Sequence, residues 1–161
     1  MTDVRDIIVA WAKWAAANHD KFHYTQGPTR MNNIGKPGVL PVNADCSSFV
    51  TLCYNWAGAN DPNGMGYNHT GYTGTLLSHG KKIALKDVLP GDVIVYGGGT
   101  GEHTALIVGV DGKNNPLTIS HGQEHDPSYV HVNQDGRKPQ TYLRFNTTAI
   151  ADKNIHQPPK A

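Results

Sequence analysis

A cysteine and a histidine occupy positions in this chain where a thiol could serve as a nucleophile. Cys46 opens a segment with helical apolar spacing, and His103 heads an apolar, strand-like run. The N-terminus of a helix favours a thiolate through its dipole, and an imidazole can accept the thiol proton. Asp45 opposes this, because a carboxylate beside a thiolate disfavours it, so His103 must dominate. The pair predicts nucleophilic catalysis, although position alone explains Cys46 equally well as a small buried hydrophobic residue.

A third polar group is expected to hold the His103 imidazole in one tautomer, and two residues compete for this role. His121 and Glu124 both follow the next apolar run. Regular antiparallel pairing through the turn at residues 111–116 places Glu124 opposite His103, and a carboxylate would stabilise the imidazolium well. A bulge in the pairing would bring His121 over instead. Both residues stay candidates.

Two helices are predicted to position the first of these groups. Residues 4–17 carry apolar side chains at a helical period, and residues 46–57 form a second amphipathic helix with Asp45 as its N-cap. Segments 22–44 and 60–80 are rich in glycine, proline and asparagine, so we expect them to be irregular. Long loops of this composition often line binding sites.

The second half of the chain contains short apolar runs that are typical of strands. Helices followed by an antiparallel series of strands indicate an α+β domain, with the Cys46 helix packed on the sheet. The predicted strands cover residues 92–96, 103–110, 117–121, 129–132 and 141–145.

The composition fits one globular domain that needs no metal or disulfide for stability. The chain has 161 residues, 17% charged residues and a net charge of +1, so a nucleic-acid partner is not expected. No stretch approaches the roughly 20 apolar residues of a membrane span, and we recognise no secretion signal. A single, monomeric domain is predicted over residues 1–150, with a disordered tail over residues 151–161.

Both cysteines are expected to be free thiols. Cys46 and Cys53 would lie on one helix, about 10 Å apart along its axis, which is too far for a disulfide. Cys53 lies inside the helix without help from the dipole, so we expect it to belong to the core.

Four motifs occur in an order that resembles the NlpC-type cysteine peptidases. They are residues 45–50 (Asp-Cys-Ser-Ser-Phe-Val), residues 89–94 (Leu-Pro-Gly-Asp-Val-Ile), His103 before an apolar strand, and residues 119–121 (Ile-Ser-His). The resemblance covers residues 24–145 and implies a papain-like fold, shared with the related CHAP amidases. It implies an enzyme that cleaves amide bonds in the stem peptides of bacterial peptidoglycan, with no metal or other cofactor.

The resemblance also implies roles for individual residues. By it, Cys46 is the nucleophile, His103 is the general base, and His121 is the polar residue that orients the base. Glu124 is an additional candidate for that last role and has no counterpart in the family pattern.

Three further residues resemble the part of the family's site that binds substrate. Tyr24 corresponds to an upstream tyrosine, and Asp45 and Ser47 match positions that line the substrate groove. Ser48 departs from the pattern, since glycine is more common at that position.

A cell-wall substrate without a recognised secretion signal predicts a bacteriophage lysin. Such a chain would be made in the bacterial cytoplasm and would act on the wall after release, or as part of a virion. A secreted bacterial enzyme shown without its signal is the alternative.

Two other readings of these residues compete with a thiol enzyme. Cys46, His103, His121 and His125 could ligate zinc, as in a zinc-dependent amidase. Alternatively, the chain could be a non-catalytic cell-wall-binding or virion structural module. The glycine-rich residues 97–101 lack the lysine and helix of a phosphate cradle, so a mobile loop beside His103 is expected there.

Overall fold

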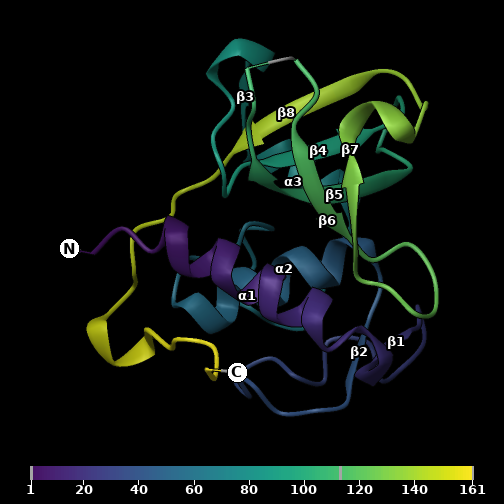
Figure 1. The fold of residues 1–161 in the computed structure, drawn as a ribbon. Coiled ribbons are helices and arrows are strands. Elements are labelled where there is room, and N and C mark those ends of the chain that lie inside the picture. Colours follow the sequence, from purple (N-terminus) through teal and green to yellow (C-terminus); the bar gives the residue numbers. More distant parts are fainter. Residues whose placement is uncertain (1, 113, 161) are drawn as a thin grey trace.

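Helices pack on one face of an antiparallel sheet in this chain (Figure 1). A computed structural model describes residues 2–112 and 114–160. The helices are α1 (Arg5–Ala17), α2 (Cys46–Ala57) and α3 (Thr73–His79), and the strands are β1 (Phe22–Tyr24), β2 (Val42–Ala44), β3 (Lys81–Ile83), β4 (Val93–Tyr96), β5 (His103–Gly109), β6 (Leu117–Ser120), β7 (Ser128–His131) and β8 (Gln140–Arg144). The main sheet has the order β3-β8-β4-β5-β6-β7, and β1 and β2 form a separate parallel pair. The predicted α+β class is confirmed.

Helix α2 starts at Cys46 because Asp45 and Ser48 form a capping box. The Ser48 N–H donates to Asp45 Oδ1 at 3.0 Å, and the Asp45 N–H donates to the Ser48 hydroxyl at 2.7 Å. At the other end, Gly58 adopts a left-handed conformation with φ 94°, and a Cβ there would lie 2.6 Å from Asn154 O. These two ends fix the helix, and with it the position of Cys46.

Hydrophobic clusters cover both faces of the main sheet. The larger cluster lies between the sheet and helices α1 and α2 and includes Trp11 and Trp56, whose ring centres are 5.0 Å apart. The smaller cluster lies on the opposite face and includes Ile94 and Ile107. Strand β5 has side chains in both clusters, so His103 stands at the start of a strand that is buried on both faces.

Segments that were predicted to be irregular contain regular structure. Residues 22–44 include β1 and β2, and residues 60–80 include α3. The tail contains a 3-10 helix over Asp152–Asn154, and the disorder predicted for residues 151–161 stays a prediction. There the Trp11 indole N–H donates to His156 O at 2.7 Å, because a buried indole needs an acceptor.

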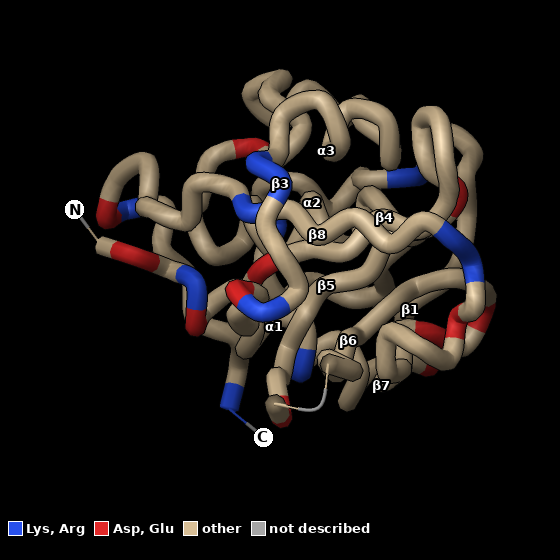
Figure 2. The backbone as a smooth tube through the Cα atoms, turned by 90° about the horizontal axis from the view of Figure 1, so that it is seen from above, with Lys and Arg blue, Asp and Glu red and all other residues tan. Residues whose placement is uncertain are grey.

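Acidic and basic residues are interspersed along the described backbone (Figure 2).

The carboxylate of Asp92, in the motif at residues 89–94, is fully buried between Arg5 and Arg144. The nearest contacts are 2.9 Å to Arg5 Nη1 and 2.8 Å to Arg144 Nη2. Asp92 therefore joins α1 and β8 to the turn before β4.

Within the described residues, no helix has the length and apolar character of a membrane span.

Candidate active site

Cys46 is half-buried at the N-terminus of α2, beside the first residues of β5. Burial raises the pKa of its thiol above the usual value, and the negative charge of Asp45 raises it further. The backbone N–H groups of Thr104 and Ser47, and then the Arg30 guanidinium, act in the opposite direction without cancelling the increase. Burial thus outweighs the expected effect of the helix end. The resting side chain is a neutral thiol, so a base must take its proton for it to react.

Arg30 is a residue of this site that the sequence did not single out. Its Nε lies 2.9 Å from Asp45 Oδ1, and its Nη2 donates to Ser47 Oγ and to Gly71 O, both at 2.8 Å. Asp45 and Ser47, predicted to line a substrate groove, are therefore held by the same guanidinium. Arg30 and Lys36 are both cationic residues of the same glycine- and proline-rich segment, so the sequence alone does not distinguish Arg30.

His103 lies at the start of β5, one residue before the Thr104 amide that lies near the Cys46 sulfur. The residue His103 is 8% exposed. Its ring stacks on Tyr96, with ring centres 5.9 Å apart and planes inclined by 16°. Burial lowers the pKa of the imidazole, and the positive charge of Arg137 lowers it further. His103 is therefore neutral near pH 7, which is the form of a general base.

His121 lies just beyond the end of β6 with its ring fully buried. The ring packs edge-on against Phe22, Tyr24 and Phe49, with centres 5.6 to 6.3 Å apart. Burial lowers the pKa of this imidazole, and neither ring nitrogen has a hydrogen-bond partner in the described structure. The backbone of His23 lies near enough to influence the ring, but without the alignment of a hydrogen bond.

The predicted register between β5 and β6 is wrong by two residues. Leu106 pairs with Ile119, and a shift in register occurs between Ile107 and Gly109. The prediction assumed a regular hairpin without a bulge, whereas this bulge interrupts the pairing of β5 with β6. Continued along the strands, the pairing places Gly122 opposite His103, and a Cβ on Gly122 would lie 3.3 Å from His103 Cε1.

Glu124, the alternative third residue, makes its contacts elsewhere. Its carboxylate is half-exposed, accepts from the Tyr24 N–H at 2.6 Å, and lies 2.9 Å from His23 Nδ1. The pKa of Glu124 is lowered by these hydrogen bonds, with His23 as the larger cause. Glu124 thus joins its loop to β1, and the pairing described above does not bring it opposite His103.

A carboxylate that the sequence argument missed lies closer to His103. Asp126 is 9% exposed, and its Oδ2 accepts from the Gly122 N–H at 2.8 Å while its Oδ1 accepts from the Ser128 hydroxyl at 2.9 Å. A Cβ on Gly122 would lie 3.7 Å from Asp126 Oδ2 and 3.3 Å from His103 Cε1, so Gly122 separates the two groups. The charges of Asp135 and, to a smaller extent, Asp126 raise the pKa of His103, and Asp126 raises that of His121, which limits the effect of burial.

Tyr24 ends β1 and contacts the His121 ring. Burial raises the pKa of its phenol, and the charges of Cys46 and Asp45 raise it further, which places all three side chains together. Gln26 Nε2 lies 3.5 Å from the Tyr24 hydroxyl. The structure therefore brings Tyr24, Asp45, Cys46 and Ser47 to one place, with His103 and His121 entering from the ends of β5 and β6.

Comparison with known proteins gives matches by structure. No family model and no curated protein matches the chain by sequence. RipA, a protein that interacts with a resuscitation-promoting factor, superposes with a TM-score of 0.53 at 17% identity, over 92% of this chain and 67% of RipA. The peptidoglycan hydrolase RipB from Mycobacterium tuberculosis gives 0.52 at 19% identity, over 87% of this chain and 65% of RipB. A lipoprotein-like NlpC/p60 protein from Staphylococcus aureus gives 0.55 at 15% identity, over 91% of this chain and 43% of that one.

The chain has the NlpC/p60 fold. It spans about two thirds of the RipA and RipB structures and less than half of the staphylococcal one. The NlpC/p60 fold expected from the four sequence motifs is thus present, and identities below 20% make it a likeness of fold.

The glycine-rich loop of the chain is bonded to α3. Thr73 Oγ1 donates to Thr100 O at 2.7 Å, and a Cβ on Gly101 would lie 2.7 Å from Val95 Cγ1. Residues 97–101 therefore form a turn next to His103 in which Gly98, Gly99 and Thr100 are exposed, and the mobility expected there stays a prediction.

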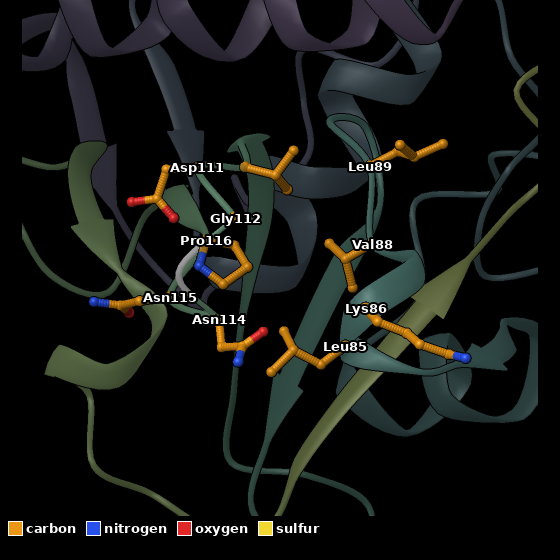
Figure 3. Close-up of a pocket in the computed structure, with 10 residues that line it drawn as sticks. Leu85, Lys86, Val88, Leu89, Asp111, Gly112, Asn114, Asn115 and Pro116 are labelled. Carbon is orange, nitrogen blue, oxygen red and sulfur yellow. The ribbon is translucent and has the colours of Figure 1, made fainter.

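A hollow at the far end of β5 contains none of the candidate site residues (Figure 3). It has a volume of about 260 Å³ and is lined by residues including Val88, Val110 and Pro116. Since β5 begins at His103 and ends at Gly109, this hollow lies a strand length away from the candidate site.

The zinc-site hypothesis requires several ligand side chains to lie together in the described part of the chain. Among residues 2–112 and 114–160, no three His, Cys, Asp or Glu side chains come together as a metal site. His125, one of the four residues considered for zinc, has its backbone carbonyl 3.1 Å from His19 Nδ1 and lies on the surface.

Proposed function

We propose that this chain is a cysteine peptidase that cleaves amide bonds in the stem peptides of bacterial peptidoglycan. The observation that carries the proposal is the position of Cys46, which lies at the start of α2 beside the backbone N–H of Thr104, the residue that follows His103 in β5. An NlpC/p60 fold supports the substrate class, since the structurally similar RipB is a peptidoglycan hydrolase.

The resting state is expected to be a neutral thiol beside a neutral imidazole. Burial raises the pKa of Cys46 and lowers that of His103, so the preformed thiolate–imidazolium pair is disfavoured. His103 would therefore remove the thiol proton as the sulfur attacks the scissile carbonyl. The N–H groups at the start of α2 would stabilise the oxyanion.

The leaving amine completes the first half of the reaction. The His103 imidazolium donates its proton to the amine nitrogen as the carbon–nitrogen bond breaks, which leaves a thioester on Cys46. His103 then removes a proton from water, and the hydroxide replaces the sulfur to give a carboxylic acid. The sulfur leaves as a thiolate and takes this proton back from the His103 imidazolium, which returns Cys46 and His103 to their starting forms.

Two side chains are proposed to assist His103. His121 follows from the family resemblance, and its ring is fully buried with neither nitrogen hydrogen-bonded in the described structure. Asp126 supplies the nearby negative charge that a transient imidazolium needs, and it does so from a position fixed by the Gly122 N–H. We assign Glu124 a structural role, since its carboxylate is bonded to β1.

Tyr24, Asp45 and Ser47 are proposed to contact the substrate. All three surround Cys46, and Arg30 holds two of them through Asp45 Oδ1 and Ser47 Oγ. Their polar groups could pair with the backbone of a bound peptide on the side of the thiol away from His103. The bacteriophage origin inferred from the sequence stays a prediction.

Mass spectrometry of digested peptidoglycan tests the proposal. Purified peptidoglycan is incubated with wild type, with Cys46→Ala, and with Cys53→Ala as a matched control for loss of the buried thiol. We expect fragments with new amino and carboxyl termini from wild type and Cys53→Ala only, and the fragments identify the bond. Binding of wild type to peptidoglycan without any new fragment would instead indicate the non-catalytic wall-binding module.

A further inference from the structure

The rim of the candidate active site carries a guanidinium that the proposed chemistry does not use. Arg137 lies between β7 and β8, and its side chain is 42% exposed. Its positive charge lowers the pKa of His103, and it also interacts with the charge of a Cys46 thiolate. Arg137 therefore lies within electrostatic range of both reacting groups while remaining accessible from solvent.

Contacts on one side fix the orientation of this guanidinium. Nε and Nη2 of Arg137 donate to Asp135 Oδ1 and Oδ2 at 2.7 and 2.6 Å. The guanidinium carbon lies 6.0 Å from the centre of the Tyr96 ring, which stacks on His103. Arg137, Tyr96 and His103 thus form a connected group, and the cation keeps its place beside the base.

One edge of the guanidinium is left open. A guanidinium has two edges that each present two parallel N–H donors to a carboxylate. Asp135 occupies the edge formed by Nε and Nη2, and among the described residues no acceptor is bonded to Nη1 of Arg137. The edge formed by Nη1 and Nη2 is therefore available to an anion from outside.

We propose that Arg137 binds a free carboxylate of the substrate beside the bond that is cut, and that it selects stem peptides with a carboxylate over those with a carboxamide at that position. This inference rests on the proposed function. A carboxylate can accept both N–H groups of the open edge. A carboxamide offers a single acceptor oxygen, and its NH₂ group would meet the guanidinium donor to donor.

Paired peptides test this selection. The two synthetic stem peptides contain the bond identified by the digest and differ only in a carboxylate or a carboxamide next to it. Wild type is expected to prefer the carboxylate peptide by about tenfold in kcat/KM, the size expected for a charged hydrogen bond at an exposed site. Arg137→Gln should reduce this ratio to near one, mainly through KM. Lys138→Gln removes a neighbouring exposed charge of the same loop and should keep the ratio.

The ratio of the two peptides separates substrate binding from the influence of Arg137 on His103. A change in the pKa of His103 affects both peptides equally, so it cancels in the ratio for each variant. The affinities of both peptides for Cys46→Ala, with and without Arg137→Gln, give the same comparison without turnover.

Two outcomes would overturn the inference in different ways. Equal ratios in wild type and Arg137→Gln, in turnover and in affinity, would remove Arg137 from substrate selection while leaving the peptidase proposal intact. Failure of wild type to cleave either peptide or peptidoglycan would contradict the proposed function, and this inference with it.

Discussion

The Arg30 guanidinium and the Asp45 carboxylate form an ion pair directly before the candidate nucleophile, with 2.9 Å between Nε and Oδ1. Asp45 is needed as the cap that starts α2 at Cys46, but its charge disfavours a thiolate on the next residue. Arg30 lowers the pKa of Cys46 and so offsets part of that effect. A loop residue therefore makes the helix cap compatible with a reactive thiol.

Replacing Arg30 should make the Cys46 thiol harder to ionise. In Arg30→Gln the lowering effect of the guanidinium is lost and that of Asp45 remains, so the pKa of Cys46 should rise. The rate of alkylation by iodoacetamide as a function of pH measures this, with a midpoint at higher pH than in wild type. Arg30→Lys keeps a positive charge and should shift the midpoint less. An unchanged midpoint in a folded Arg30→Gln protein would show that the ion pair does not influence the thiol.

The acid side of the pH profile should report His103. Burial and the charge of Arg137 hold the pKa of His103 below its ordinary value of 6.5. The base form is lost only when the pH falls through this lowered pKa, so half-maximal kcat/KM on the acid side is expected below pH 6.5. A midpoint above that value would contradict a buried, neutral base.

Asp126 and Glu124 should differ in their effect on that profile. Asp126 raises the pKa of His103, so Asp126→Asn should move the acid midpoint to lower pH. Glu124→Gln removes a carboxylate of similar chemistry that is bonded to His23 and Tyr24, and the midpoint should stay in place. A shift in Glu124→Gln without one in Asp126→Asn would reverse the two assignments.

Gly122 should be required for the position of the His103 ring. A methyl group in Gly122→Ala would lie 3.3 Å from His103 Cε1, closer than ordinary contact, so the ring must move. Misplacement of a catalytic group by a fraction of an ångström to one ångström can reduce kcat by about tenfold to a hundredfold. Gly109→Ala is the control, since its methyl group would meet Leu117 Cβ at an ordinary 3.6 Å. Equal kcat values in the two variants would refute the steric requirement.

Asp92 should contribute to stability and not to catalysis. Asp92→Asn leaves Arg5 and Arg144 without the charge they share, which should lower the free energy of unfolding by about 3 kcal/mol. Urea unfolding measures this, and the folded fraction should keep the wild-type kcat. Asp152→Asn, at an exposed carboxylate, should change stability by less than about 0.5 kcal/mol. A loss of kcat in folded Asp92→Asn would give the motif a role in the reaction.

Local signals in the sequence were sufficient for the elements that carry the candidate pair. The cap at Asp45 and the apolar spacing after it located α2 within a residue, and the alternation after His103 located β5. The NlpC/p60 fold followed from four ordered motifs.

Contacts between distant segments could not be predicted in the same way. The predicted register differs from the observed one by two residues, of which the bulge between Ile107 and Gly109 accounts for one, and no local pattern announces that bulge. Arg30 pairs with Asp45, which is distant in the sequence, and Asp126 is bonded to Gly122 across a loop turn. The sequence does not indicate these partners, so it could not assign either charge to the candidate site. The irregular composition of residues 60–80 likewise concealed α3, a helix of seven residues that depends on tertiary packing.

Thiol catalysis by Cys46 is tested by comparing the rates at which wild type and Cys46→Ala cut amide bonds of peptidoglycan. The rates are measured side by side from the new amino termini that are released. Loss of the nucleophile should reduce the rate by about a thousandfold or more while the variant keeps its fold and its affinity for peptidoglycan. Release of the same termini at a comparable rate by folded Cys46→Ala would contradict thiol catalysis at this site.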